Sequence, residues 1–471
     1  MFPVPRTELF IVLLAAFVAI AGAGVYAMRQ GHGGTVAGYF LAGRLMGWPI
    51  LGGSLFVTIV GSLAALWVVM PSAWRPELWI LVSGIVTGML VIGLVFMPRV
   101  RDAAPVTFPG YVAARFGRRV GVAMSLSSIL LTVLVRIPVV IVLGGAALRS
   151  LLGWDLTMTA ILAIVVPGLF AVAGGYSAVL ATQGVEAVFA IGGIAVLAVR
   201  GSWMSEFAGD GWGGVPGQSV PLLAGAAAVM GFWYICVDQF TVQRSLAARS
   251  TREVRGGAIS AAVLTVAAIV LLAAASGTTL MPAPAGAPEP DFASGLLGAG
   301  ILSIIMAYVS GHFLSMSALF TSDVFALIRP GKDETSLVLV GRLCSSVAAI
   351  LAMLTALSTS VLPSPPARWF SVPYIVLAPP VVAITVIGMP WRRMHARGAR
   401  WGLALGWVGG ALFAALRMGD GALPEAYLEG VLVSFLVAAL VLVAVSLAAA
   451  PLTAGASAPA MLEQGWGGRK G

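Results

Sequence analysis

Residues 46–70 read MGWPILGGSLFVTIVGSLAALWVVM, a run without one charged side chain. About 20 apolar residues in a helix cross the hydrocarbon core of a bilayer. Comparable runs recur along the whole chain, and no polar block between them is long enough to fold alone. They lie near residues 8–28, 46–70, 77–97, 120–148, 155–173, 177–199, 220–243, 256–280, 292–328, 336–358, 370–390, 400–416 and 428–450. The pattern predicts an all-α integral membrane protein with about thirteen transmembrane helices.

The composition also indicates a membrane domain. Charged residues make up 10% of the chain and apolar residues 59%, whereas soluble domains carry about 25% charged residues. So few charges cannot solvate a soluble surface of this size. We therefore expect one transmembrane domain over residues 1–450 and a disordered cytoplasmic tail over residues 451–471, which are rich in Ala, Gly and Ser. The run at 8–28 is too long for a signal peptide, and we expect it to stay as a leading helix.

The net charge of +9 is explained by the membrane and requires no nucleic acid. If the N-terminus lies outside, most Lys and Arg residues fall in cytoplasmic loops, as membrane insertion favours. These loops carry Arg99, Arg101, Arg115, Arg118, Arg119, Arg244, Arg249, Arg252, Arg255, Arg392, Arg393, Arg397 and Arg400, and the outer segments carry Arg6, Arg75, Arg149, Arg200, Arg368 and Arg417. An odd number of helices places the C-terminus inside. We expect a multi-pass protein of a bacterial-type inner membrane, with the lipid bilayer and a small solute as its partners.

Helix-weakening glycines gather in two of the apolar runs. In the second run, Gly52, Gly53 and Gly61 surround hydroxyl residues, and in the seventh Gly231 precedes Trp233, Tyr234 and Asp238. Each run is a candidate broken helix. Without the leading helix, these two begin five-helix units of opposite topology, the inverted-repeat plan of many transporters. The alternative is that the glycines only allow close helix packing.

Several motifs resemble the solute:sodium symporter family, which includes carriers of sugars, proline, pantothenate and sialic acid. They are Tyr39–Arg44 followed by Met46–Trp48, Phe108-Pro109 with Ala114–Phe116, Gly174–Tyr176 with Thr182, Asp238-Gln239 with Gln243-Arg244 and Leu246–Ala248, Phe320-Thr321 with Asp323, and Gly398-Ala399 with Trp401-Gly402. They keep the family order from about residue 38 to 450. The resemblance implies a LeuT-like fold of two inverted five-helix repeats, 46–199 and 220–390, with a leading helix at 8–28 and two trailing helices within 400–450.

Arg136 is the most informative single residue because it lies deep within an apolar run, Leu-Thr-Val-Leu-Val-Arg-Ile-Pro. At 1.5 Å per residue it is about 18–22 Å from either end of its helix. Its guanidinium must therefore face the bundle interior or a wet cavity. A guanidinium can hold a carboxylate through two parallel hydrogen bonds. Arg136 also resembles a substrate-facing position of the family, where sialic acid carriers have an arginine. We predict an anionic, carboxylate-bearing solute; the alternative is a permanent ion pair with Glu186 or another acid.

Three more residues are candidate substrate ligands. Thr58 and Ser62 lie where the second helix is expected to be unwound, so that their hydroxyls could bind a solute. The alternative is that such hydroxyls bond a backbone carbonyl one turn back. Tyr234 resembles the tyrosine that closes the inner side of the pocket in sugar carriers, and it is otherwise a packing aromatic.

The sodium site of the family is degenerate here. The resemblance places two adjacent hydroxyl residues at positions that hold Ala307 and Tyr308, and two backbone carbonyl ligands at Val57 and Val60. The family also usually has an aspartate where this chain has Gln183. Since sodium requires several oxygen ligands, sodium coupling is in doubt.

Buried titratable residues offer another route to coupling. Glu186 lies about three turns inside its helix and could carry a proton, and His312 is a second candidate. Their alternatives are an interhelical hydrogen bond for the glutamate and a packed core position for the histidine. Asp238 and Asp323 precede Arg244 and Arg329, so we expect ion pairs at helix ends or elements of an inner gate.

The sequence predicts a secondary transporter and not an enzyme. The chain has three histidines and lacks HExxH, GxSxG and paired Asp-rich motifs. We predict symport of a small carboxylate, coupled to a cation, by alternating access. No cofactor is expected, and no metal beyond a transported Na⁺. A proton-coupled or uncoupled carrier, and a receptor on the same fold that does not transport, remain the alternatives.

Overall fold

The computed structural model describes residues 7–30, 32–69, 88, 90, 92–204, 220–274, 292–359, 366–417 and 423–449. These residues are almost all helical, which confirms the all-α fold class. The α-helices are α1 (Thr7–Arg29), α2 (Val36–Leu41), α3 (Trp48–Val69), α5 (Met97–Asp102), α6 (Phe108–Phe116), α7 (Arg118–Leu131), α8 (Ile137–Leu152), α9 (Leu156–Met204), α10 (Val220–Phe232), α11 (Gln239–Ala247), α12 (Thr251–Ala274), α13 (Phe292–Leu319), α14 (Ala326–Ile328), α15 (Glu334–Ser358), α16 (Pro366–Ala383), α17 (Ala396–Arg417) and α18 (Leu423–Ala448). Short π-helical turns join several of them: η3 (Ile92–Phe96), η4 (Thr132–Arg136), η6 (Trp233–Val237), η7 (Phe320–Phe325) and η9 (Ile384–Gly388).

Within the described part of the chain, eight helices are long and apolar enough to cross a membrane, or nine if one bent pair counts as a span. The expected number of thirteen is therefore not confirmed. The span Leu156–Val199 contains two of the expected helices. The expected helix at 77–97 and the expected tail at 451–471 lie largely or wholly outside the described residues.

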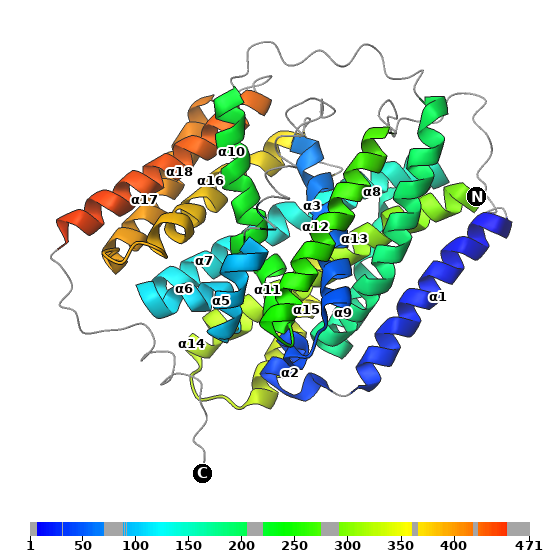
Figure 1. Cartoon of the computed structure of the whole chain (residues 1–471), viewed down its shortest axis with the longest axis horizontal. Helices are drawn as coiled ribbons and strands as arrows, with labels where there is room; N and C mark the ends of the chain where they lie inside the picture. Colours follow the sequence, from blue (N-terminus) through cyan, green and yellow to red (C-terminus); the bar gives the residue numbers. More distant parts are fainter. Residues whose placement is uncertain are drawn as a thin grey trace.

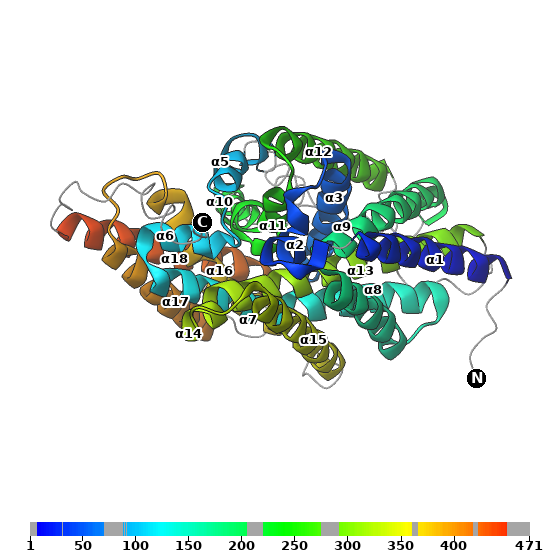
Figure 2. The same cartoon turned by 90° about the horizontal axis from the view of Figure 1, so that it is seen from below.

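The leading and trailing helices lie at opposite ends of the molecule (Figure 1). Helix α1 packs against α9 and α13, and α17 packs with α18 and α16. Helices α3, α9 and α13 contact one another between these ends. Figure 2 shows α12 and α15 on opposite sides of the central helices. Elements that are far apart in sequence, such as α3, α9 and α13, thus meet in the centre of the bundle.

The burial pattern fits a helical bundle in lipid. Large apolar side chains on the outside of the bundle stay exposed, among them Leu354, Leu416 and Leu440. Polar side chains such as Arg136 and Arg244 are instead fully buried inside. Since charged groups inside a membrane are costly and face the bundle interior, these buried residues are candidates for function.

Two helices are interrupted where the sequence places glycine or a helix-capping residue. Helix α9 consists of two helices that meet at Gly175, whose backbone (φ 63°, ψ −155°) is outside the helical region. A Cβ atom at Gly175 would lie 2.7 Å from the backbone oxygen of Tyr39, so only glycine fits there. Helices α10 and α11 bend by 41° at Asp238, which confirms the predicted break in the seventh run.

The predicted break in the second run is wrong. Helix α3 is continuous from Trp48 to Val69. Its glycines serve close packing: a Cβ at Gly52 would collide with Ser260 of α12, and one at Gly61 with the ring of Tyr308 of α13. The alternative use of membrane glycine, as a site of close helix approach, therefore holds for α3.

Candidate functional site

Arg136 forms a buried ion pair with Asp238. Its Nη1 atom donates to the Asp238 carboxylate at 2.8 Å, and the two side chains are 1% and 3% exposed. Arg136 ends the π-turn η4, just before Pro138, which has no N–H to continue the α-helical hydrogen bonds. Asp238 begins α11, where its carboxylate also accepts from the backbone N–H of Phe240 at 3.2 Å. Two irregular points of the backbone thus place opposite charges together.

This pairing bears on two expectations. It agrees with the alternative stated for Arg136, a buried ion pair with an acid, and among the described residues that acid is Asp238 and not Glu186. Asp238 does not form the expected ion pair with Arg244. Although the two residues are close in sequence, Asp238 binds Arg136 and Arg244 binds Ser54. A pairing across 102 residues of sequence depends on how η4 and η6 pack, which no local pattern reveals.

One edge of the Arg136 guanidinium lacks a hydrogen bond of good geometry. Its Nε and Nη2 atoms are buried and meet the distance and angle criteria with no partner among the described residues, although the Tyr374 side chain lies within interaction range of the guanidinium. These two N–H groups point in parallel, and they form the edge with which arginine grips a carboxylate in a bidentate manner. A buried donor without a partner costs about 1–3 kcal/mol, more when it is charged. The site therefore favours a ligand that brings acceptor oxygens to this edge.

Aromatic residues surround the guanidinium. It lies over the ring of Trp233, with Cζ 5.5 Å from the ring centre. Tyr234 is the next residue in η6, and its ring lies 6.0 Å from that of Tyr374 on α16. The Trp233 Nε1 atom is also buried without a hydrogen-bond partner among the described residues, and the Tyr234 side chain interacts with Tyr374. The arrangement is typical of a small-molecule site, with an apolar lining and a few convergent polar groups.

The other predicted substrate ligands are only partly placed at this site. Tyr234 follows Trp233 in η6, and Trp233 is the residue whose ring lies under the Arg136 guanidinium. The Thr58 hydroxyl donates to the backbone oxygens of Ser54 and Leu55 in its own helix, which is the alternative stated for it. The side chain of Ser62 lies outside the described residues.

A second buried cation, Arg244, lies deeper among the central helices. Its Nε donates to the Ser54 hydroxyl at 2.7 Å, its Nη2 to Gln183 Oε1 at 3.3 Å, and its Nη1 to the backbone oxygen of Phe240. The Gln183 amide nitrogen donates to the backbone oxygen of Ala307 at 2.8 Å. Helices α3, α9, α11 and α13 thus share one polar cluster. The sequence indicated Gln183 only as a missing acid and did not indicate the position of Arg244.

The two candidate proton carriers are both buried. Glu186 is 1% exposed, and its Oε2 has no hydrogen-bond partner among the described residues. His312 Nδ1 lies 2.8 Å from the backbone oxygen of Tyr308, so this nitrogen carries a proton, and Nε2 has no partner. The imidazole stacks on Phe240 at 3.9 Å between ring centres. His312 therefore has features of the packed core residue that was its alternative, while Glu186 lacks the interhelical hydrogen bond at Oε2.

Asp323 does not form the expected ion pair at a helix end. Its carboxylate accepts from the Thr107 hydroxyl at 2.7 and 2.9 Å and from the Ser125 hydroxyl at 2.7 Å. Arg329 follows beyond the helix end, where the chain turns away. Asp323 thus ties η7 to the start of α6 and to α7 through neutral partners.

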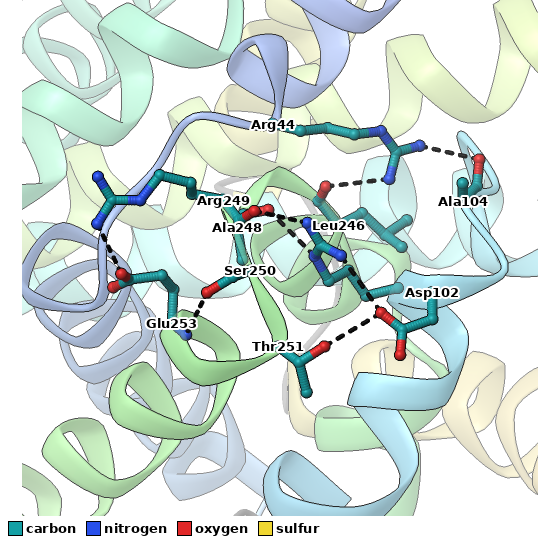
Figure 3. A network of polar contacts seen from close by, with 10 residues as sticks. Arg44, Asp102, Ala104, Leu246, Ala248, Arg249, Ser250, Thr251 and Glu253 are labelled. Atoms are coloured by element: carbon teal, nitrogen blue, oxygen red, sulfur yellow. Dashed lines mark hydrogen bonds and ion pairs between the residues drawn. The ribbon is translucent and has the colours of Figure 1, made fainter.

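A loop network that the sequence did not predict joins three segments at one end of the bundle (Figure 3). Arg44 donates to the backbone oxygens of Ala104 and Leu246, and Arg101 donates to the backbone oxygen of Arg249. Further bonds join Thr251 to Asp102 and Arg249 to Glu253, and the Glu253 carboxylate accepts from the backbone N–H of Trp48 at 2.7 Å.

The same network favours the charged form of the Glu253 carboxyl group. Glu253 lies in the first turn of α12, before the apolar part of that helix. The hydrogen bond from Arg249 holds the pKa of the Glu253 carboxyl below its usual range. Because arginines and two carboxylates, Asp102 and Glu253, tie the segments before α3, at the end of α5 and before α12, opening this end of the bundle requires breaking several charged hydrogen bonds together.

Comparisons with known proteins agree with this architecture. The model of the sodium:solute symporter family matches residues 39–211 and 219–406. The chain belongs to the sodium:solute symporter family. Family membership makes the protein a multi-pass membrane transporter rather than an enzyme, one that couples the movement of a small solute to that of a cation.

Individual relatives extend the comparison. The sodium/glucose cotransporter 4 of Danio rerio is 26% identical over 85% of this chain and 70% of its own length, and the sodium/mannose cotransporter of Bos taurus is 27% identical over 86% and 78%. Among solved structures, a Na⁺-coupled sialic acid symporter in a substrate-bound, outward-open state superposes with a TM-score of 0.79 at 19% identity, covering 94% of this chain and 98% of the other. That likeness confirms the predicted LeuT-like fold.

The residues at the family's cation positions lie on two helices that pack together, α3 and α13. Ala307 and Tyr308 lie on α13, and the Tyr308 ring packs on Gly61 of α3, one residue beyond Val60. Val57 lies in the same continuous helix, so its carbonyl is available for an intrahelical hydrogen bond. Ala307 has no hydroxyl and Tyr308 has a phenolic one, and the Ala307 carbonyl already accepts from Gln183.

Proposed function

We propose that this symporter takes up a small carboxylate, whose carboxyl group binds the Nε–Nη2 edge of Arg136. The observation that supports this is the buried, unpartnered edge of a guanidinium whose other end is already neutralised by Asp238. A solute carboxylate would supply both missing acceptors at once. Trp233 and Tyr234 would then contact the rest of the solute from η6.

A sugar is the second candidate, because the relatives are named as sodium/glucose and sodium/mannose cotransporters. A neutral sugar would leave the Arg136 edge to hydroxyl acceptors, which grip guanidinium less strongly than a carboxylate does. Glucose and glucuronate separate the two candidates, since they share a pyranose ring and differ in a CH₂OH or a carboxylate at one carbon.

Family membership supports sodium as the coupling cation, and the buried carboxylate of Glu186 supports a proton as the alternative. We propose Glu186 as the proton carrier, because its buried carboxylate has no cation beside it among the described residues.

We further propose that the protein lies in a bacterial-type inner membrane with its N-terminus outside. Its two repeats would span residues 46–199 and 220–390, between the leading and trailing helices. A receptor without transport activity would bind the same solute and show no uptake.

The test is uptake into proteoliposomes under a sodium gradient, a proton gradient or neither. Labelled glucuronate, N-acetylneuraminate, glucose and mannose are compared in the parent and in Arg136→Gln. We expect gradient-driven uptake of at least one acid, lost in the variant, and no uptake of the two sugars. Uptake of glucose or mannose that survives in Arg136→Gln would refute the carboxylate proposal, and binding without uptake would favour the receptor.

A further inference from the structure

Three buried tyrosines gather near Arg136. Tyr234 belongs to η6, Tyr374 to α16 and Tyr427 to α18. Their side chains are almost fully buried, and none of the three hydroxyls has a hydrogen bond of good geometry among the described residues. Buried hydroxyls of this kind are uncommon, because each forfeits the hydrogen bonds that water would offer. Three of them in one place indicate a polar network that a solute completes.

Tyr374 connects the group to the guanidinium. Its side chain lies within interaction range of Arg136 and of Tyr234, and the centres of the two tyrosine rings are 6.0 Å apart. Tyr427 lies in turn within interaction range of Tyr374. The contacts therefore lead from Tyr427 through Tyr374 to Arg136.

Tyr427 belongs to a trailing helix, outside the two proposed repeats. Helix α18 packs against α16, which carries Tyr374, and against α10, which leads into η6. A Cβ atom at Gly430 of α18 would lie 2.9 Å from the side chain of Ile375, so the two helices approach closely beside Tyr374. Residues three apart share one face of a helix. The face of α18 that meets α16 thus carries Tyr427 toward Tyr374.

The chemistry of a phenol hydroxyl allows these residues to act in series. Such a hydroxyl donates one hydrogen bond and accepts two. A guanidinium only donates, so the Tyr374 oxygen can accept from Arg136 while its O–H stays available for an oxygen of the solute. The second lone pair of Tyr374 can accept from the Tyr427 hydroxyl. Because hydrogen bonds in a chain polarise one another, a donor behind Tyr374 strengthens the bond from Tyr374 to the solute.

We propose that Tyr427 of α18 is a positioning residue of the solute site, whose hydroxyl donates to Tyr374 and turns the Tyr374 O–H toward the solute at Arg136. Tyr427 does not touch the solute itself. Helix α18 thereby takes part in solute recognition, although it lies outside the two proposed repeats. This inference rests on the proposed function in one respect, the placement of the solute at Arg136.

The test is equilibrium binding to the purified protein in detergent. Glucuronate, N-acetylneuraminate, glucose and mannose are titrated, and the probe that binds the parent most tightly is then titrated into the variants. These are Tyr427→Phe, Tyr374→Phe, their double variant and Arg136→Gln. The matched control is Tyr176→Phe on α9, which also removes a buried hydroxyl that has no hydrogen-bond partner among the described residues. Thermal melting shows that each variant is folded.

We expect Tyr427→Phe to weaken binding of the probe about three- to tenfold, the effect of one net hydrogen bond. In the Tyr374→Phe background, Tyr427→Phe should have no further effect, because Tyr427 acts through Tyr374. The Tyr176→Phe control should bind within about twofold of the parent.

An affinity like that of the parent in Tyr427→Phe would overturn the proposal, and so would losses that add up in the double variant. A lower melting temperature with unchanged affinity would assign Tyr427 to packing alone and also overturn it. Arg136→Gln separates the two claims. If Arg136→Gln binds like the parent while Tyr427→Phe binds more weakly, the placement of the solute at Arg136 fails and the positioning role of Tyr427 stands.

Discussion

Replacing Asp238 by Asn separates the structural role of the Arg136–Asp238 pair from its effect on the solute. The pair is buried at 2.8 Å, and removal of one partner of a buried ion pair costs about 3–5 kcal/mol. Asn retains an oxygen for Arg136 Nη1 and is as good an N-cap as Asp. Any loss of folding stability in Asp238→Asn is therefore caused by removal of the negative charge. We expect destabilisation near the lower end of that range.

The same substitution has the opposite effect on a bound carboxylate. A solute on the Nε–Nη2 edge would lie about 6 Å from Asp238 across the guanidinium, where two negative charges repel by about 3 kcal/mol at an effective dielectric of about 20. Removal of the Asp238 charge relieves this repulsion. Relief of even half of this repulsion energy would tighten the binding of the carboxylate by about tenfold.

Both quantities can be measured on purified protein in detergent. Thermal melting gives the stability of the parent, Asp238→Asn and Asp238→Ala, and titration with glucuronate or N-acetylneuraminate gives the affinity. The account predicts that Asp238→Asn melts at a lower temperature than the parent and binds the acid more tightly. An unchanged melting temperature would refute the buried pair, and weaker binding of the acid would make Asp238 a ligand of the solute and refute the proposed geometry.

Three further outcomes follow from single contacts. Gly175→Ala forces a Cβ against the Tyr39 backbone at a positive φ and should cost about 1–3 kcal/mol or more. The control Gly184→Ala adds a Cβ that meets nothing within 4 Å, so it should melt within about 2 °C of the parent. Equal melting temperatures for the two variants would contradict the kink at Gly175. Asp323→Ala removes a carboxylate that accepts from two hydroxyls and should cost about 3 kcal/mol or more, so a thermal melt unchanged from the parent would show that these bonds contribute nothing. Glu186→Gln should abolish proton-driven uptake into proteoliposomes and keep solute exchange, and proton-driven uptake at the parent rate would exclude Glu186 as the carrier.

Features with a local cause were predictable from the sequence. Apolar runs gave the all-α membrane class, and short motifs gave the family. A break in the seventh run was predicted because the helix-weakening Gly231 precedes Trp233, Tyr234 and Asp238, and the bend lies at Asp238. The two helices expected at 155–173 and 177–199 meet at Gly175, where a positive φ requires glycine.

Features that depend on neighbours distant in sequence were not predictable. The glycines of α3 predicted a broken helix, but α12 and α13 pack closely against them and the helix is continuous. Arg136 was correctly expected to be buried, yet its partner Asp238 was assigned to Arg244, because pairing in three dimensions depends on the packing of η4 against η6. The position of Arg244 beside Gln183 required the assembled bundle for the same reason.

The most direct test of the account is equilibrium binding of a carboxylate and of its methyl ester to the parent and to Arg136→Gln. Glucuronate and N-acetylneuraminate, each with its ester, are suitable probes because esterification removes the charge and keeps the remaining groups. Two hydrogen bonds to a charged group contribute about 3 kcal/mol or more together, so one acid should bind the parent about 100-fold more tightly than its ester. In Arg136→Gln this preference should disappear, and equal binding of acid and ester by the parent would contradict a carboxylate held by Arg136.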